Sequence, residues 1–340
     1  MLAIVVLSAT AMLAGCGSDA PTSTPGTSTP STSTPAPTTT AGPTVATTDP
    51  TPSEATTVTS GTTIAATDSP CGHSTAPPAT YQHVVMLVEE NRTWTGGRSA
   101  AVGTGFSGGD MPYLQGLAEQ CSYFVDWAEM DADENSLNQY IGLTSGVKSQ
   151  TVSDDCEPSA DCMSTDDNIF RQVRESGGTA RTYVDGATEA CSVGDNAAKH
   201  IPALYYRGGD DQSHCTDEVR PFSEFDANDL PTFAFIVPDL CHDGHDCGDS
   251  TVDEWARSTL EPVLTSESYL RGETLVVVIY DEDQPVPNLL IAPTAHPGPI
   301  EDLVGSHASL FKTVELALGL PVLDQGEVPD APSLRPATNI

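Results

Sequence analysis

Apolar and polar positions alternate along the chain in blocks that predict strands and helices in turn. The run His83–Val88 is apolar and β-branched enough for a buried strand, and Thr274–Tyr280 repeats this pattern far downstream. Further strands are expected at Tyr123–Trp127, Thr179–Val184, Thr232–Val237 and Asn288–Ala292. Helical spacing predicts helices at Met111–Gln120, Leu137–Thr144, Asn168–Ser176, Thr251–Leu264 and Ser306–Leu318. This alternation predicts an α/β fold, in which helices flank a mainly parallel sheet on both faces.

The N-terminal part of the chain is unlike the rest. Residues Leu2–Ala14 form a short uncharged apolar run before Gly15-Cys16, which is typical of a lipoprotein-type signal sequence, residues 1–16. Its cleavage leaves Cys16 for lipid attachment, and a plain secretory signal is the alternative. Residues 17–70 are rich in Thr, Ser, Pro and Ala, and they predict a disordered tether because they hold too few large apolar residues to form a core. We therefore expect an exported protein, lipid-anchored at the cell membrane or extracellular.

The remaining residues are enough for one sizeable core, so we expect a single domain at 71–323, followed by a C-terminal tail at 324–340. The whole chain has 340 residues, with 13 Lys and Arg against 48 Asp and Glu and a formal net charge of −35. Such an acidic surface repels polyphosphate backbones, so nucleic acid is not an expected partner.

Nine cysteines are present, and eight remain when Cys16 is set aside for lipidation. An even number in an exported chain predicts disulfides, and the short separations favour Cys156–Cys162, Cys191–Cys215 and Cys241–Cys247, which leaves Cys71 for Cys121. A zinc site built from Cys241, His242, His245 and Cys247 is the competing interpretation.

Acidic residues directly follow two of the expected apolar strands, His83–Val88 and Thr274–Tyr280. Glu89-Glu90-Asn91 comes at the end of one, and Asp281-Glu282-Asp283 follows the other. The carboxyl ends of parallel strands form the crevice where ligands bind, so we expect both sets to meet there. For either stretch alone, a polar turn is the alternative. The predicted ligands of a divalent metal ion are Glu90, Asn91, Asp281 and Glu282. An all-oxygen set suits Mg²⁺, Ca²⁺ or Mn²⁺, whereas a nearby histidine would admit Zn²⁺ or Fe.

Two further stretches carry reactive residue types. Ser136 opens a helical pattern, where free backbone N–H groups attract anions and a nearby dication would make the hydroxyl a nucleophile; a plain N-cap serine is the alternative. The segment Pro238–Cys247 follows a predicted strand and holds two His and three Asp, which suit metal binding or proton transfer to a leaving alkoxide.

Four blocks in this order resemble the phosphoesterase family of bacterial acid phosphatases and phospholipases C. They are Glu90-Asn91-Arg92, the segment Ser136–Gly146, Pro238-Asp239 with His245-Asp246, and Asp281-Glu282, and the resemblance runs from about Tyr81 to Leu320. It implies a single domain with an alkaline-phosphatase-like fold and an enzyme that hydrolyses phosphoric ester bonds.

The resemblance also implies roles for single residues. Ser136 matches the family's nucleophile, His245 and His307 match histidines expected in catalysis, and His200 matches one expected at the substrate. Where the family shows Pro-Asn, this chain has Asn138-Gln139, whose carboxamides are expected to contact the phosphate instead.

Together these features predict an exported, metal-dependent phosphoesterase that is acid phosphatase-like. It would cleave a small phosphate ester through a phosphoserine intermediate. The alternatives are a phospholipase C-type phosphodiesterase and a catalytically inactive surface lipoprotein that binds phosphate or metal.

Overall fold

The computed structural model describes residues 69–92, 111–131 and 135–340. The predicted signal sequence, Cys16 and almost all of the predicted tether lie outside the described residues. Contacts divide the chain into two units, Met1–Thr62 and Thr63–Ile340, and every described residue belongs to the second. Within the described ranges, no helix has the length and apolar character that crossing a bilayer requires.

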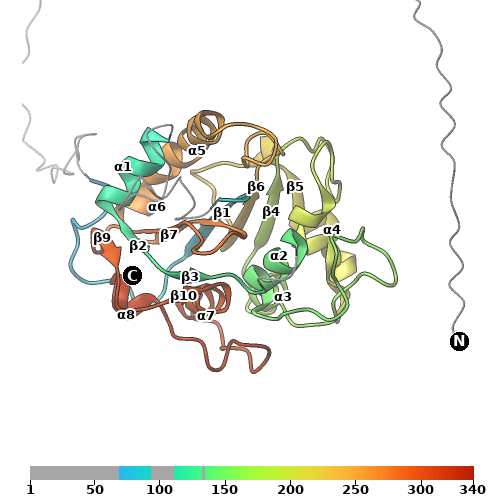
Figure 1. The fold of residues 1–340 in the computed structure, drawn as a ribbon. Coiled ribbons are helices and arrows are strands. Elements are labelled where there is room, and N and C mark those ends of the chain that lie inside the picture. Colours follow the sequence, from blue (N-terminus) through green and yellow to red (C-terminus); the bar gives the residue numbers. More distant parts are fainter. Residues whose placement is uncertain (1–68, 93–110, 132–134) are drawn as a thin grey trace, which may run out of the picture. The chain divides into compact units, whose positions relative to one another are not determined.

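A mainly parallel sheet forms the centre of the domain (Figure 1). Only β8 among its strands runs antiparallel to its neighbours within the described residues. In spatial order the strands are β5 (Val219–Pro221), β4 (Ala180–Val184), β6 (Phe233–Val237), β1 (His83–Glu89), β7 (Thr274–Tyr280), β8 (Asn288–Ile291), β2 (Ser122–Phe124) and β9 (Gly298–Ile300). A separate pair joins β3 (Trp127–Ala128) to β10 (Gly305–Ser306). The central strands are buried on both faces, as their continuous apolar runs predict.

Helices cover both faces of the sheet, which confirms the predicted fold class (Figure 1). On one side lie α1 (Pro112–Gln120), α5 (Asp249–Leu264) and α6 (Glu267–Leu270). On the other lie α2 (Ser136–Ser145), α3 (Ile169–Glu175) and α7 (His307–Leu318). The other helical elements are η1 (Ala198–His200), η2 (Pro202–Tyr205), α4 (Asp211–Glu218), η3 (Phe222–Glu224) and α8 (Arg335–Thr338).

The register of the central strands fixes what meets at their carboxyl ends. β1 pairs in parallel with β7, with Glu89 opposite Tyr280, so Glu90 and Asp281 begin the two following loops side by side. The N–H of Asp281 donates to the carbonyl of Glu89 over 3.0 Å. β6 flanks β1 on its other side. Asp243 lies in the loop after β6, and its backbone carbonyl accepts a hydrogen bond from the Glu90 N–H.

The folded part continues beyond Leu323, where the sequence prediction ended it. Val328, Leu334 and Ile340 are buried and belong to the hydrophobic core, and α8 lies in this segment. Their isolated apolar positions show no helical or strand period, so the pattern did not reveal that the segment packs against the domain.

Four disulfides join the predicted pairs: Cys71–Cys121, Cys156–Cys162, Cys191–Cys215 and Cys241–Cys247. Because Cys241 and Cys247 are bonded to each other, the alternative zinc site, which needs both as thiolates, is wrong. The disulfides suggest an exported protein, since such bonds persist in oxidising compartments.

Glu315 on α7 makes the stability of the domain depend on pH. Its side chain is fully buried, and one oxygen accepts hydrogen bonds from Gln172 Nε2 (3.0 Å) and the Leu323 N–H (2.9 Å). Burial raises the pKa of Glu315 from 4.5 to about 7. The charge of Lys312 lowers this pKa and the charge of Asp167 raises it, but both effects are smaller than that of burial. The stability that the neutral Glu315 carboxyl gives the folded domain is therefore fully present below about pH 4.5. It is lost as the pH rises toward 7, because the unfolded chain ionises this group first.

Glu315→Gln is expected to raise the free energy of unfolding relative to wild type at pH 8 by roughly 2–3 kcal/mol, with little difference near pH 4.5. A glutamine oxygen still accepts both hydrogen bonds and never ionises. Chemical unfolding of both proteins at the two pH values measures the effect. An equal difference at both pH values would contradict it.

Candidate active site

Three carboxylates converge at the carboxyl ends of β1 and β7. One oxygen from each of Glu90, Asp281 and Glu282 lies within 4.8 Å of the others, so these residues form a group that could hold a metal ion. Asn91 orders the group: its N–H donates to Asp281 Oδ1 over 3.0 Å, and its Nδ2 donates to Glu282 Oε1 over 2.5 Å. Asn91 has a φ of 48°, a left-handed backbone that asparagine tolerates better than most residues. The structure thus brings Glu90, Asp281 and Glu282 together and places Asn91 beside them as a donor to two of the carboxylates.

The electrostatics of this group fit a cation. Asp281 is fully buried, and its Oδ2 has no hydrogen-bond partner among the described residues. Burial, followed by the charges of Glu90 and Glu282, raises the pKa of Asp281 well above its usual range. Burial and then the Glu90 charge raise the pKa of Glu282 to about 7. A divalent cation bound among these oxygens would offset the repulsion and satisfy the unpartnered one.

Ser136 is the first residue of α2, with Asn135 at the N-cap. Its buried hydroxyl donates to Glu282 Oε1 over 3.2 Å and to Glu90 Oε2 over 3.3 Å. The Lys199 ammonium donates to the same Oγ over 3.4 Å. No side-chain capping bond is formed at this helix start, so the plain N-cap alternative for Ser136 does not hold. The hydroxyl lies directly against the carboxylate group.

His200 joins a second acidic group that shares Glu90 with the first. Glu90, His200 and Asp243 are all buried, and one atom of each lies within 4.8 Å of the others. His200 Nε2 is 2.9 Å from Glu90 Oε1, and its Nδ1 is 3.4 Å from Asp243 Oδ2. Burial lowers the pKa of His200, but the charges of Glu90 and Asp243 outweigh this and raise it to about 9. In this state a charged imidazolium links the two acids.

His245 lies at the rim of this group. Its ring centroid is 6.4 Å from that of His200, and its Nδ1 is 2.7 Å from Asp246 Oδ1. The side chain is 37% exposed, in contrast to the buried His200. A partly exposed imidazole beside a carboxylate is suited to exchange protons with a bound ester.

The predicted substrate contacts of Asn138 and Gln139 are wrong. Both side chains are buried and bond the backbone of neighbouring loops. Asn138 Oδ1 accepts from the Ser149 N–H and its Nδ2 donates to the Val152 carbonyl. Gln139 Oε1 accepts from the Met130 N–H and its Nε2 donates to the Asp131 carbonyl. These buried amides hold the loops around α2 and are not exposed to a bound phosphate.

The predicted catalytic role of His307 is also wrong, because both of its ring nitrogens are already hydrogen-bonded. The residue is fully buried; its Nε2 donates to the Asp281 carbonyl over 2.6 Å, and its Nδ1 accepts from the Trp127 indole N–H over 3.1 Å. Burial lowers the pKa of His307 to about 4, which keeps the ring neutral. His307 therefore positions the backbone of Asp281 and does not face a substrate.

The sequence matches the phosphoesterase family over residues 95–321. This chain belongs to the phosphoesterase family. It is therefore a hydrolase that acts on phosphoric esters. The matched range includes Ser136, His200, Asp243 and the pair Asp281-Glu282, and it begins after Glu90 and Asn91.

Two relatives agree with this assignment, and one solved structure agrees with the fold. The chain is 27% identical over 258 residues to a phosphatidylinositol-3-phosphatase of Mycobacterium tuberculosis, covering 71% of this chain and 78% of that protein. It is 30% identical over 144 residues to an acid phosphatase of Aspergillus fumigatus, covering 38% of this chain and 32% of that protein. A protein in the alkaline phosphatase superfamily from Vibrio parahaemolyticus has a similar fold, with a TM-score of 0.50 at 12% identity over 71% of this chain and 67% of its own.

Sequence reasoning assigned no role to three residues of this phosphoesterase site. Asp243 stands in the acidic Pro238–Cys247 segment, but its carboxylate was not singled out there. Lys199 is the neighbour of His200 and one of the few cations in an acidic chain, which is the feature that could have identified it. Asp155 comes from a long loop without periodicity, and the sequence gives no indication of its place.

A third group, formed by Asp185, Asp239 and His242, lies at the carboxyl ends of β4 and β6. His242 Nδ1 is 2.6 Å from Asp185 Oδ2 and 3.2 Å from Asp239 Oδ1, and its ring stacks on Trp255 at 5.5 Å between centroids. These contacts, with the Cys241–Cys247 disulfide, fix the loop that carries Asp243 and His245.

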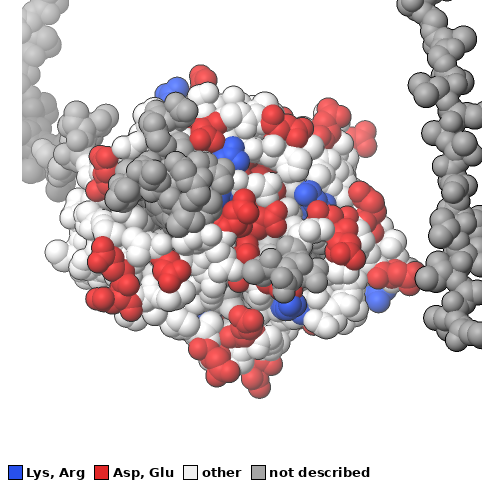
Figure 2. Space-filling view, in the orientation of Figure 1, with Lys and Arg blue, Asp and Glu red and all other residues white. Residues whose placement is uncertain are grey.

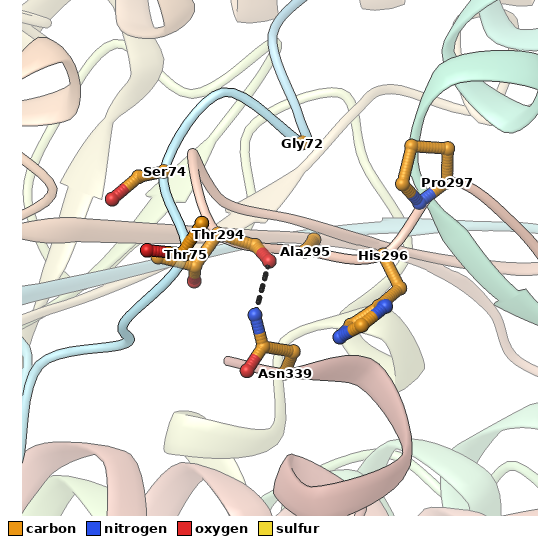
Figure 3. A pocket seen from close by; sticks show the side chains of 8 residues that line it. All are labelled: Gly72, Ser74, Thr75, Thr294, Ala295, His296, Pro297 and Asn339. Atoms are coloured by element: carbon orange, nitrogen blue, oxygen red, sulfur yellow. Dashed lines mark hydrogen bonds between the residues drawn. The ribbon is translucent and has the colours of Figure 1, made fainter.

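A cavity of about 300 Å³ lies away from this chemistry (Figure 3). It is lined by Gly72, Ser74, Thr75, Thr294, Ala295, His296, Pro297 and Asn339. Asn339 Nδ2 donates to the Thr294 carbonyl across it (Figure 3). Because β8 runs antiparallel to β7, the residues after Ile291 lie at the sheet edge opposite Asp281, and the cavity shares no residue with the site.

Proposed function

We propose that this protein is an exported, metal-dependent phosphatase that transfers the phosphoryl group of a small ester to Ser136 and then to water. The observation that carries the proposal is the position of Ser136 Oγ, which lies at the start of α2 within hydrogen-bond distance of Glu90, Glu282 and Lys199. A hydroxyl among acceptors for its proton and beside a cation for the incoming phosphate is suited to nucleophilic attack.

The residues support a two-step reaction. In the first step, Ser136 Oγ attacks phosphorus, its proton passes to a neighbouring carboxylate, the Oγ–P bond forms and the P–O bond to the leaving group breaks. His245 is the proposed donor of a proton to the departing alkoxide, because it is partly exposed and is paired with Asp246. In the second step, water attacks the phosphoserine, which releases inorganic phosphate and restores the serine hydroxyl.

A divalent ion would be held by Glu90, Asp281 and Glu282, with Asn91 ordering two of these carboxylates. When bound, it would supply positive charge for the serine oxygen and the phosphoryl group. The oxygen donors suit Mg²⁺, Ca²⁺ or Mn²⁺, whereas the adjacent His200 group, which shares Glu90, would also admit Zn²⁺ or Fe.

Export is supported by the four disulfides. We extend the proposal to a lipid anchor at Cys16, a tether at 17–70 and a folded domain that begins near Cys71. The apolar Leu2–Ala14 run before Gly15-Cys16 and the Thr/Ser/Pro-rich composition after it support this arrangement.

A monoester substrate is favoured over a phospholipid diester. The relatives from Mycobacterium tuberculosis and Aspergillus fumigatus are both named phosphatases.

Purified protein is expected to hydrolyse p-nitrophenyl phosphate, to lose at least about 100-fold of this activity after treatment with a chelator, and to recover it with one of the named cations. p-Nitrophenyl phosphorylcholine is the comparison substrate. Preferential hydrolysis of that diester would favour a phospholipase C-type enzyme, and phosphate binding without turnover of either ester would favour an inactive binding lipoprotein.

A further inference from the structure

The carboxylate of Asp155 lies across the start of the nucleophile helix. Its Oδ1 accepts a hydrogen bond from the Leu137 N–H over 3.0 Å, and its Oδ2 accepts one from Lys199 Nζ over 3.2 Å. The same Lys199 nitrogen is 3.4 Å from Ser136 Oγ. The Asp155 carboxylate therefore accepts hydrogen bonds from two donors next to the proposed nucleophile: the N–H of the following residue, Leu137, and the Lys199 ammonium.

The backbone segments that carry both donors are held by contacts other than Asp155. The Leu137 N–H belongs to the first turn of α2, where N–H groups have no intrahelical acceptor. Lys199 is held by η1, next to the buried His200. Burial lowers the pKa of Lys199, but the charges of Glu90, Asp155 and Asp281 outweigh this and raise it, so the side chain remains an ammonium.

Asp155 is delivered by a loop that the fold fixes. The neighbouring Cys156 is bonded to Cys162, and its carbonyl accepts a hydrogen bond from the Tyr205 hydroxyl over 2.9 Å. Asp154 and Asp155 both have left-handed φ values, 53° and 52°, which are uncommon for residues other than glycine. The loop conformation points the Asp155 carboxylate at α2, whereas Asp154 is exposed.

The geometry points to Lys199 Nζ and the Leu137 N–H as the contacts for the non-bridging oxygens of the substrate phosphoryl group, with Asp155 as an anion from the chain itself that the phosphoryl group must displace. This inference rests on the proposed function, because it concerns the same reaction at Ser136. A carboxylate and a phosphoryl group present similar anionic oxygens to a pair of donors.

Charge and access favour this exchange. Acidic side chains outnumber basic ones on the face that Figure 2 displays, as they do in the whole sequence, so a phosphate dianion needs a local cation. Lys199 supplies one in direct contact with Ser136. The Lys199 and Asp155 side chains are 19% and 26% exposed, so a solute can reach the pair from solvent.

Asp155→Asn is the first test, with Asp154→Asn as the matched control. Asparagine keeps an acceptor for the Leu137 N–H but loses the charge that holds Lys199, so inorganic phosphate, measured by calorimetry on the metal-loaded protein, is expected to bind about tenfold more tightly. The KM for p-nitrophenyl phosphate is expected to fall by a similar factor. Asp154→Asn removes the same charge one residue away and is expected to behave like wild type.

Lys199→Met is the second test. Phosphate affinity and kcat/KM are expected to fall by about 100-fold, whereas Lys199→Arg is expected to retain part of both, and Lys312→Met, a lysine on α7, is expected to change neither. In the double variant Asp155→Asn, Lys199→Met, the gain from the Asp155 substitution should disappear, because no ammonium remains to be released. Thermal unfolding of each variant verifies that it is folded.

Two results would overturn the inference: phosphate affinity in Asp155→Asn no higher than in Asp154→Asn, or a gain that persists without Lys199. If folded, metal-loaded wild-type protein hydrolyses neither ester, the proposed function fails instead. The phosphate titrations remain readable in that case and still decide whether Asp155 competes for the Lys199 site.

Discussion

Ser136→Ala is expected to lower kcat for p-nitrophenyl phosphate by at least about 1,000-fold, because it removes the oxygen that forms the covalent intermediate. The effect on folding should be small. Ser136 makes no capping bond, and within the part of the chain that the structure describes its hydroxyl bonds Glu90, Glu282 and Lys199. We expect the free energy of unfolding to change by less than about 1 kcal/mol.

Ser145→Ala provides a matched control on the same helix. Ser145 is also buried in α2, and its Oγ donates to the Ile141 carbonyl over 2.8 Å, away from the carboxylates. This variant is expected to lose some stability and to keep its activity. Activity, thermal unfolding and metal content should be measured on the same samples. Near wild-type turnover by Ser136→Ala would exclude the serine as nucleophile, and loss of metal would reassign its hydroxyl to metal binding.

The strand-end acids could be predicted from the sequence because two simple rules coincide there. Continuous apolar runs identify strands buried on both faces, and parallel strands bring their carboxyl ends to one edge. β1 and β7 pair residue by residue up to Glu89 and Tyr280, so the acids that follow the two apolar runs lie at the same level of the sheet. Glu90 and Asp281 meet for that reason.

The directions of side chains in α2 could not be predicted in the same way. Every residue of this helix is buried, so its sequence has no polar face to show which way Asn138 and Gln139 point. Both amides turned out to satisfy backbone groups of neighbouring loops, which is a common use of buried polar side chains. His307 was misjudged for a related reason, because its partners come from Trp127 and the backbone of Asp281, both distant in sequence.

The positions of three loop residues could not be predicted from the sequence either: Lys199, Asp155 and Asp243. They come from connections between strands, where no periodicity relates position in the chain to position in space. Their places depend on disulfides, turns and single hydrogen bonds, such as the Tyr205 hydroxyl on the Cys156 carbonyl. The cysteine spacing did predict the disulfides that close these loops, but not which acid each loop presents.

Glu90→Gln is expected to remove the bound metal and to lower activity by orders of magnitude, whereas Glu89→Gln should do neither. Glu90 belongs to two groups of possible metal ligands, one with Asp281 and Glu282 and one with His200 and Asp243. Burial raises the pKa of Glu90, but the charges of His200 and Lys199 lower it on balance, which favours the ionised carboxylate. Glutamine removes the charge that faces the cation and His200. Breaking a buried pair of this kind also costs on the order of 3 kcal/mol of stability.

Glu89 is a matched control because it is the last residue of β1 and directly precedes Glu90, and successive side chains of an extended chain point to opposite faces. It is fully buried, neither carboxylate oxygen has a hydrogen-bond partner within the described ranges, and burial raises the pKa of Glu89 well above its usual range. This direction favours the neutral acid, which glutamine matches in shape and charge. Metal analysis and thermal unfolding of both variants separate ligand loss from unfolding. Stoichiometric metal in folded Glu90→Gln would exclude Glu90 as a ligand, and metal loss in Glu89→Gln would move the site to the other face of β1.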